Sequence, residues 1–392
     1  MSGKFEPHNE AGKKRGGSSL LVILLILLIV AALAVAALFL LPDLLSFQPP
    51  QETEPSTEMT QAPTTEPTTV PTTEPTTVPT TEPAPVYTNP LTGEVIEAPL
   101  DKRIFAVSIN NLPYAVPHVG TNQADIFMEM LVNGSIIRGL ALYTDPSDVP
   151  AIGSVRSDRF MFNNICLHYD AIMIHAGGDS TVLANARERG ISNYNIDTWD
   201  ATDYSFRDKE RNRAGYDWEH CLFAKGDGLE AHAIEKEISV DQDPEKDYCL
   251  RFTEDGTPEG GEDASTVSLT FKYKTTKKDT SMIYNPELGK YVYHQYEKDM
   301  VDDATGEPEA FRNVLILIAD IKMISRGFYE GDLVTGGEGY YACGGKIIPI
   351  TWGSDSEDSP LWFKTLDGEP LLMGVGNSYI AIAPLDSPVS YE

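Results

Sequence analysis

An uninterrupted apolar run at residues 20–41 constrains this chain more than any other feature of its sequence. The run reads LLVILLILLIVAALAVAALFLL and contains neither a charged residue nor a proline. As a helix that rises about 1.5 Å per residue, it would span about 33 Å, close to the hydrocarbon thickness of a bilayer. We therefore predict a transmembrane helix over residues 19–42.

The residues on either side of this run indicate its orientation. Lys13, Lys14 and Arg15 come directly before it, and such residues favour the cytoplasmic side of a membrane. The run exceeds the ~7–15 apolar residues of a cleaved signal peptide and lacks a small-residue cleavage site. We predict a retained signal anchor, a cytoplasmic tail at residues 1–18, and a single-pass protein of the cell membrane whose C-terminal domains are extracytoplasmic.

A Thr/Pro/Glu-rich segment follows the predicted anchor at residues 43–87. Its centre repeats the pattern PTTEPTTV. Frequent prolines remove backbone donors and block helix and sheet, and the segment has little apolar surface to bury. We predict a disordered stalk that holds the folded part away from the membrane.

The chain is strongly acidic. It has 30 Lys and Arg against 59 Asp and Glu, a formal net charge of −29, and most of the acidic excess lies beyond the apolar run. This charge argues against nucleic acid as a partner, because the field repels polyanions at long range. Any site for an anion must therefore be a local basic pocket.

Residues 88–238 combine strand and helix patterns. Asn133-Gly134 separates two apolar runs, DIFMEMLV and IIRGLALY, which is a strong hairpin signal. Short apolar runs at 104–109 and 171–174 are typical of buried strands. Helical patterns occupy 159–169, 181–189 and 226–238, the first with Ser157 or Asp158 as its N-cap. We predict an α/β or α+β extracellular domain.

The remainder of the chain divides into a linker and a strand-rich segment. Residues 239–264 are acidic and contain Gly and Pro, as in DQDPEKD and EDGTPEGGED. From residue 265 onward, apolar alternating runs such as VSLTFKY and SYIAIAP are separated by turn residues. We predict an acidic linker at 239–264 and a mainly antiparallel β-rich domain at 265–392.

An arginine-rich segment before the first predicted helix is a candidate anion site. Arg156 and Arg159 are three residues apart, with Ser157 between them, so at a helix start they would share one face. Two guanidinium groups beside free helix N–H groups would bind phosphate or carboxylate. Arg213 and Arg138 are candidates to join them, together with Arg207 and Arg211. The alternative is that each arginine pairs with a nearby carboxylate.

The segment from His175 to Asp179 is a second candidate, because it follows a predicted strand and precedes a helix. Gly177 and Gly178 would let the backbone approach a ligand closely. His175 is a candidate acid or base that Asp179 would orient, and His220 is the second candidate histidine. The alternative is a tight turn around a structural imidazole. We predict no metal site and no cofactor, because the Cys and His residues lack zinc-site spacing.

Several segments resemble the YerB-like family of bacterial extracytoplasmic proteins. They are NPLTG at 89–93, ADIFMEMLVNGSIIR at 124–138, IGSVRSDR at 152–159, HAGG at 175–178, NVLI at 313–316 and GGKIIPITW at 344–352. The resemblance implies an extracytoplasmic location and a two-part domain of unknown function. The chain departs from the family in having no lipidation cysteine after its apolar run, and in having Cys221 where we expect Asn.

These observations favour one function and leave two alternatives open. The first hypothesis is an envelope surface protein that binds an anionic cell-wall precursor through an Arg/His pocket. The second is an enzyme that transfers or hydrolyses a phosphate- or sugar-linked wall substrate, with His175 as acid or base. The third is a structural partner of an envelope protein of the wall-synthesis machinery.

Overall fold

The computed structural model describes residues 86–392, which belong to one compact unit. The predicted tail, the transmembrane helix at 19–42 and nearly all of the stalk at 43–87 lie outside the described residues. From residue 86 onward, no helix has the length and apolar character needed to cross a membrane.

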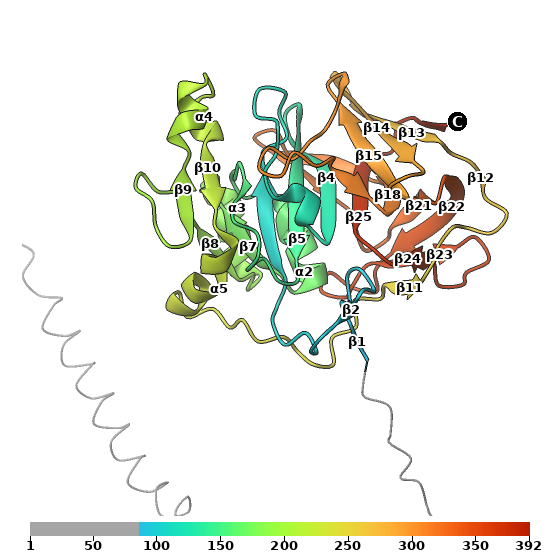
Figure 1. Cartoon of the computed structure of the whole chain (residues 1–392), viewed down its shortest axis with the longest axis horizontal. Helices are drawn as coiled ribbons and strands as arrows, with labels where there is room; N and C mark the ends of the chain where they lie inside the picture. The colour runs from blue at the N-terminus through green and yellow to red at the C-terminus, as the bar shows by residue number, and fades with distance from the viewer. Residues whose placement is uncertain (1–85) are drawn as a thin grey trace, which may run out of the picture. The chain divides into compact units, whose positions relative to one another are not determined.

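A mixed sheet of thirteen strands forms the centre of the molecule (Figure 1). Its main path runs in the order β12 (Glu262–Asp263), β22 (Lys346–Gly353), β21 (Gly337–Cys343), β18 (Asn313–Ala319), β25 (Ser378–Pro384), β4 (Ile126–Asn133), β5 (Ile136–Tyr143), β3 (Phe105–Ile109), β7 (Ile172–His175) and β8 (Asn193–Asn195). Three strands attach to this path: β19 (Ile321–Ser325), β20 (Phe328–Gly331) and β23 (Trp362–Thr365).

The central sheet passes through both parts of the chain. β25 runs parallel to β4, with Ile380 opposite Met128, and on its other side it runs parallel to β18. Figure 1 shows this junction, where the red strand β25 lies near the cyan-green strand β4. β25 is buried along its whole length and β4 along all but its last residue, which is why both read as continuous apolar runs.

A second sheet of six strands comes entirely from the C-terminal part. It contains β16 (Lys298–Asp299), β15 (Lys290–Gln295), β14 (Thr276–Asn285), β13 (Thr266–Tyr273) and β26 (Val389–Tyr391), with β17 (Ala310–Phe311) beside β15. Smaller sheets pair β6 (Ile152–Gly153) and β9 (Ser205–Arg207) with β10 (Leu222–Ala224), β1 (Tyr87–Thr88) with β2 (Val95–Ile96), and β11 (Arg251–Thr253) with β24 (Leu372–Gly374).

The helices are few and all lie in the N-terminal part of the described chain. They are α2 (Phe160–Tyr169), α3 (Ser180–Glu188), α4 (Lys209–Arg213) and α5 (Gly226–Glu235), with short 3₁₀ turns η1 (Thr121–Gln123) and η2 (Trp218–His220). The helices predicted at 159–169, 181–189 and 226–238 correspond to α2, α3 and α5.

The structure confirms a sheet-rich, two-part architecture with few helices and mostly antiparallel strands. The hairpin predicted at Asn133-Gly134 is present as β4 and β5. The strand pairs within residues 265–392 are antiparallel except for β25 with β18, and β25 also runs parallel to β4 of the N-terminal part. Residues 239–264, predicted as a linker, contribute β11 and β12, which pair with strands of the C-terminal part.

Candidate functional site

The two loops that the sequence singled out lie next to each other in the fold. Ala176 N donates to Arg156 O, and Asp158 N donates to Gly177 O, both at 2.9 Å. The loop after β7 and the segment before α2 are thus joined by a backbone ladder. Gly177 has a φ of +67°, a left-handed conformation that glycine adopts without steric cost.

The helix α2 lies where it was predicted, but the predicted N-cap at Ser157 or Asp158 is wrong. α2 begins at Phe160, its N-cap is the extended residue Arg159, and no side chain caps it. Asp158 does not reach the first turn because its Oδ1 accepts from the adjacent Arg159 N at 2.6 Å. Ser157 lies further out, and its carbonyl oxygen accepts a hydrogen bond from Arg138 Nη1 at 2.9 Å. Arg156 and Arg159 therefore belong to an extended segment rather than to one helical face.

Arg138 is the most unusual residue of the site. It comes from β5, its side chain is only 1 % exposed, and its Nε is buried without a hydrogen-bond partner. Within residues 86–392 its guanidinium makes a hydrogen bond to Ser157 O and no ion pair. Burial holds the pKa of Arg138 well below its usual range, and the charges of Arg159 and Arg156 lower that pKa further. Glu219 acts in the opposite direction, but more weakly.

Arg156 and Arg159 complete what we call the arginine cluster, defined as Arg138, Arg156 and Arg159. Arg156 pairs with Glu219 at 3.1 Å, and its Nε is buried without a partner. Arg159 Nη1 donates to the carbonyl oxygen of Asp158 at 2.6 Å rather than to its carboxylate. Burial lowers the pKa of Arg159 to about 10 and raises the pKa of Asp158 to about 7. The Asp158 carboxylate therefore neutralises the cluster only partly near pH 7.

His220 lies beside the arginine cluster. Its Nδ1 lies 2.7 Å from Asn110 Nδ2, and its Nε2 lies 3.6 Å from Glu219 Oε1. The ring of Tyr114 packs on the imidazole with centroids 5.1 Å apart. Burial lowers the pKa of His220. Glu219 therefore connects His220 to Arg156, so the structure brings these two predicted residues together.

His175 is held by two acceptors close to its own loop. Its Nδ1 lies 2.9 Å from Gly177 O, and its Nε2 lies 3.2 Å from Asn193 Oδ1. The amide orientation of Asn193 follows from its Nδ2, which donates to Ile191 O. Burial lowers the pKa of His175, and the two hydrogen bonds oppose that effect. Both ring nitrogens thus face oxygen acceptors, and the neutral imidazole donates to one of them at a time.

Asp179 and Gly178 also make structural contacts. Asp179 caps α3, because its Oδ1 accepts from Thr181 N at 2.9 Å, and its Oδ2 lies 3.5 Å from Arg326. No hydrogen bond in the described region joins it to His175. A Cβ on Gly178 would lie 3.1 Å from Leu183, so this glycine permits close packing on α3. The role of Asp179 as the group that orients His175 stays a prediction.

Arg213 is not part of the arginine cluster. It lies at the end of α4 with its side chain 68 % exposed and pairs with Glu210 three residues earlier. Arg207 pairs with Asp197, and Arg211 donates to Ala115 O at 2.6 Å. Each of these arginines has a carboxylate partner, as the alternative expected, but the partner of Arg211 is Asp303, which lies far along the chain and 3.3 Å from its Nη1.

Two family models match most of the described chain. Residues 91–239 match the N-terminal domain, and residues 269–380 the C-terminal domain, of a protein of unknown function designated DUF3048. The chain belongs to the DUF3048 family. The DUF3048 N-terminal range contains the arginine cluster, His175 and His220.

A curated relative and a solved structure resemble this DUF3048 chain along most of its length. YerB of Bacillus subtilis (strain 168), which is named as an inferred lipoprotein, is 28% identical over 300 residues, or 75% of this chain and 86% of YerB. A crystal structure of YerB from Bacillus subtilis matches with a TM-score of 0.65 and 25% identity, covering 77% of this chain and 99% of that one. The resemblance to the YerB-like family noted from the sequence is thereby confirmed.

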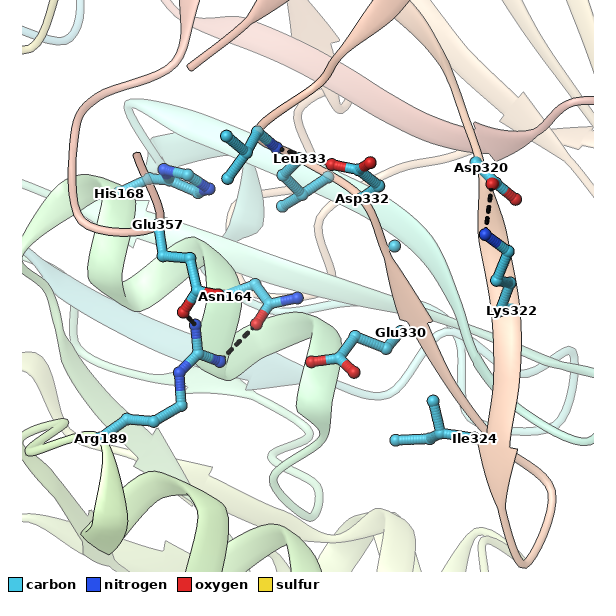
Figure 2. Close-up of a pocket in the computed structure, with 12 residues that line it drawn as sticks. Asn164, His168, Arg189, Asp320, Lys322, Ile324, Glu330, Asp332, Leu333 and Glu357 are labelled. Carbon is cyan, nitrogen blue, oxygen red and sulfur yellow. Dashed lines mark hydrogen bonds and ion pairs between the residues drawn. The ribbon is translucent and has the colours of Figure 1, made fainter. Parts of the chain in front are cut away.

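A pocket of about 310 Å³ that sequence reasoning missed lies between α2 and β20 of this DUF3048 chain (Figure 2). Arg189 reaches Asn164 Oδ1 at 2.5 Å and Glu357 at 3.0 Å at one side of it. His168 also lines it, and its Nδ1 contacts Ser359 O at 2.6 Å. These residues come from distant segments, so no local pattern marks them.

The four cysteines are free thiols, and three of them are buried. Burial raises the pKa of Cys166, Cys221 and Cys343. In the part of the chain that the structure covers, no group of three His, Cys, Asp or Glu side chains is arranged to hold a metal ion.

Proposed function

We propose that this protein is an envelope-associated, extracytoplasmic protein that binds an anionic envelope ligand at the arginine cluster. The relationship to YerB, a protein named as an inferred lipoprotein, supports an association with the cell envelope. The predicted signal anchor at residues 19–42 would provide that association here in place of a lipid. The predicted orientation would expose the arginine cluster outside the cytoplasm.

Arg138 carries the proposal for the ligand. A guanidinium that is 1 % exposed and has no carboxylate partner is costly, because burial removes its hydration without supplying a counter-charge. Two further guanidinium groups raise the local positive potential. An anion with several oxygens would supply the missing acceptors, since the arginine fork matches phosphate and carboxylate geometry.

The acidic background of the chain favours a ligand that is held at short range. A net charge of −29 repels anions from a distance. The arginine cluster must therefore bind through direct hydrogen bonds and partial desolvation, which salt screens less than a long-range field. A compact anionic group fits this requirement better than an extended polyanion.

Isothermal titration of the full-length protein in detergent with inorganic pyrophosphate tests this function. We expect saturable binding by the wild type and a loss of at least about tenfold in affinity for Arg138→Met and Arg156→Ala, because each removes a charge-assisted hydrogen bond. Arg213→Ala is the matched control, since Arg213 is exposed and pairs locally. Equal affinity of the wild type and Arg138→Met would refute the proposal.

A further inference from the structure

A second and larger pocket lies between the two parts of the described chain. It has a volume of about 700 Å³, within the range of ~300–1,000 Å³ that is usual for small-molecule sites. The N-terminal part contributes residues 112–114 and 135–137, and the C-terminal part contributes residues from β14, β15 and the turn after β15. We call it the interdomain pocket. None of the residues of the arginine cluster lines it.

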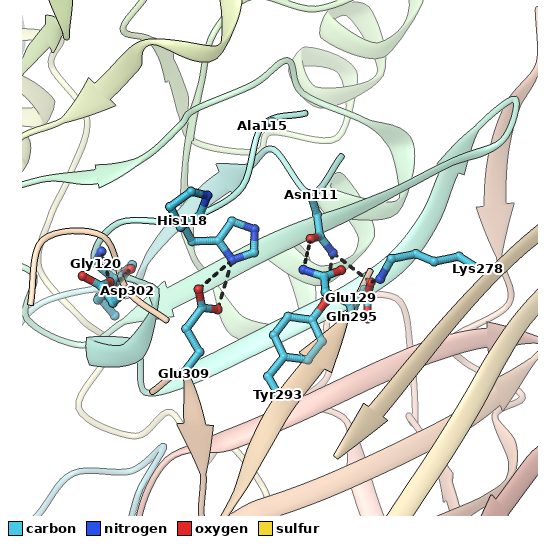
Figure 3. A network of polar contacts seen from close by, with 12 residues as sticks. Asn111, Ala115, His118, Gly120, Glu129, Lys278, Tyr293, Gln295, Asp302 and Glu309 are labelled. Atoms are coloured by element: carbon cyan, nitrogen blue, oxygen red, sulfur yellow. Dashed lines mark hydrogen bonds and ion pairs between the residues drawn. The ribbon is translucent and has the colours of Figure 1, made fainter. Parts of the chain in front are cut away.

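A chain of hydrogen bonds beside this pocket fixes which side-chain groups donate and which accept (Figure 3). The buried Glu129 carboxylate only accepts, so Asn111 donates to it through Nδ2 at 2.8 Å. Asn111 Oδ1 consequently accepts from Gln295 Nε2 at 2.7 Å. The orientation of the Gln295 amide is thereby fixed, and its Oε1 remains as a hydrogen-bond acceptor.

Gln295 Oε1 lacks a partner although the residue is only 1 % exposed and lines the interdomain pocket. A buried carbonyl oxygen without a donor is uncommon in folded proteins. A ligand that brings an N–H or O–H group to this wall would satisfy it. A purely apolar ligand would leave it unpaired.

Two tyrosine rings flank the same pocket. Tyr114 is 59 % exposed. Tyr296 follows Gln295 and has a φ of +53°, and Glu297 has a φ of +61°, so two non-glycine residues occupy a turn that usually requires Asn or Gly. Tyr296 OH donates to Asn111 O at 2.8 Å, which holds its ring at the pocket wall.

Most charged groups of the lining have partners, and Glu297 is the one among the described lining residues without an ion pair. Lys278 pairs with Glu129, Lys277 lies 3.5 Å from Asp279, and His294 lies 2.8 Å from Asp299. The pocket therefore offers aromatic faces and polar atoms, but little uncompensated charge. A ligand with a net charge would gain less here than at the arginine cluster.

We infer that the interdomain pocket binds an uncharged saccharide that carries an amide group. The C–H face of a sugar ring packs on tyrosine rings, and its hydroxyl groups meet the polar wall. An amide N–H provides the donor that Gln295 Oε1 lacks. This site shares no residue with the arginine cluster, but Tyr114 also packs on His220 beside that cluster, so the two ligands are tested separately.

Titration of the full-length protein with the β-1,4-linked trisaccharide of N-acetylglucosamine tests this inference, in a zwitterionic detergent that has no sugar headgroup. We expect saturable binding, about tenfold weaker in Tyr114→Ala because one stacked ring is lost. Tyr114→Phe keeps the ring and should bind as the wild type does. Trp199→Ala is the control, because Trp199 is a 79 % exposed aromatic residue outside the pocket.

Two further comparisons complete the test. Arg138→Met should leave the affinity for the trisaccharide unchanged, so that failure of the anion proposal is distinguishable from failure of this one. Maltotriose, which lacks an amide, should bind more weakly, and equal affinity would overturn the role of Gln295. Absence of saturable trisaccharide binding to the wild type, or an unchanged affinity in Tyr114→Ala, would overturn the saccharide site itself.

Discussion

Lys278 reaches from β14 into the core and pairs with Glu129, whose side chain is fully buried in β4. The carboxylate also accepts hydrogen bonds from Asn111, Thr280 and Tyr379. Burial lowers the pKa of Lys278, and the charge of Glu129 opposes that effect. The pair links the second sheet to the central sheet and is thus a contact between the two parts of the chain.

Replacing Lys278 with methionine should destabilise the fold. The substitution leaves the Glu129 carboxylate buried without its counter-charge, which typically costs about 3–5 kcal/mol. Denaturant unfolding of the full-length protein in detergent measures the effect. Lys277→Met is the matched control, because its side chain is 68 % exposed and its ion pair with Asp279 lies at the surface, where such pairs contribute about 0–1 kcal/mol. Similar losses in the two variants would contradict the importance of the buried pair.

Asp158 should make the stability depend on pH in a specific direction. Burial raises its pKa from 3.8 to about 7, so the folded state binds a proton more tightly than the unfolded state. The contribution of Asp158 to the free energy of unfolding is therefore fully present below about pH 4. It is lost as the pH rises toward 7, by roughly 1.4 kcal/mol per pH unit at most. Asp158→Asn should remove this loss. The free energies of unfolding of the wild type and of Asp158→Asn would be compared between pH 4 and 7. A difference between them that does not change with pH would contradict the raised pKa of Asp158.

His175→Ala should affect folding rather than ligand binding. The substitution removes both ring contacts, to Gly177 O and to Asn193 Oδ1, and we expect a loss of about 1–3 kcal/mol in the free energy of unfolding. Pyrophosphate affinity measured under native conditions should be unchanged. A stable variant that has lost turnover of a phosphate- or sugar-linked substrate would instead favour the enzymatic alternative.

Arg138→Met should stabilise the protein when no ligand is present. The methionine keeps an unbranched side chain of moderate volume and removes a buried charge without an ionic partner, so the folded state no longer carries the desolvation cost of that charge, which we expect to raise the free energy of unfolding by about 1 kcal/mol or more. Thermal unfolding in a buffer without phosphate or carboxylate measures it. A clear loss of stability would indicate that Arg138 serves the fold alone.

Local patterns predicted the elements that depend on neighbouring residues. The hairpin of β4 and β5 follows from Asn133-Gly134 between two apolar runs, and α2, α3 and α5 follow from helical periodicity. The pairing of β25 with β4 could not be predicted, because it joins residues such as Met128 and Ile380 that are far apart in the chain. Pairing over such distances depends on the whole fold rather than on local propensity.

The candidate site was predictable only where a local sequence signal marked it. Arg138 and Glu129 each interrupt an apolar strand, and an ionisable residue in such a run indicates a buried charge with a specific role. Glu210 three residues before Arg213 indicated an ordinary helical ion pair. The interdomain pocket left no local signal, because Tyr114 and Gln295 meet only through tertiary packing.

Diffraction from crystals soaked in selenate, a tetrahedral oxyanion with an anomalous scatterer, tests the central claim most directly. We predict an anomalous peak within hydrogen-bonding distance of the Arg138 guanidinium, shared with Arg156 or Arg159, that is absent in Arg138→Met. Selenate bound only at exposed arginines such as Arg213, or an identical peak in Arg138→Met, would contradict the arginine cluster as the anion site.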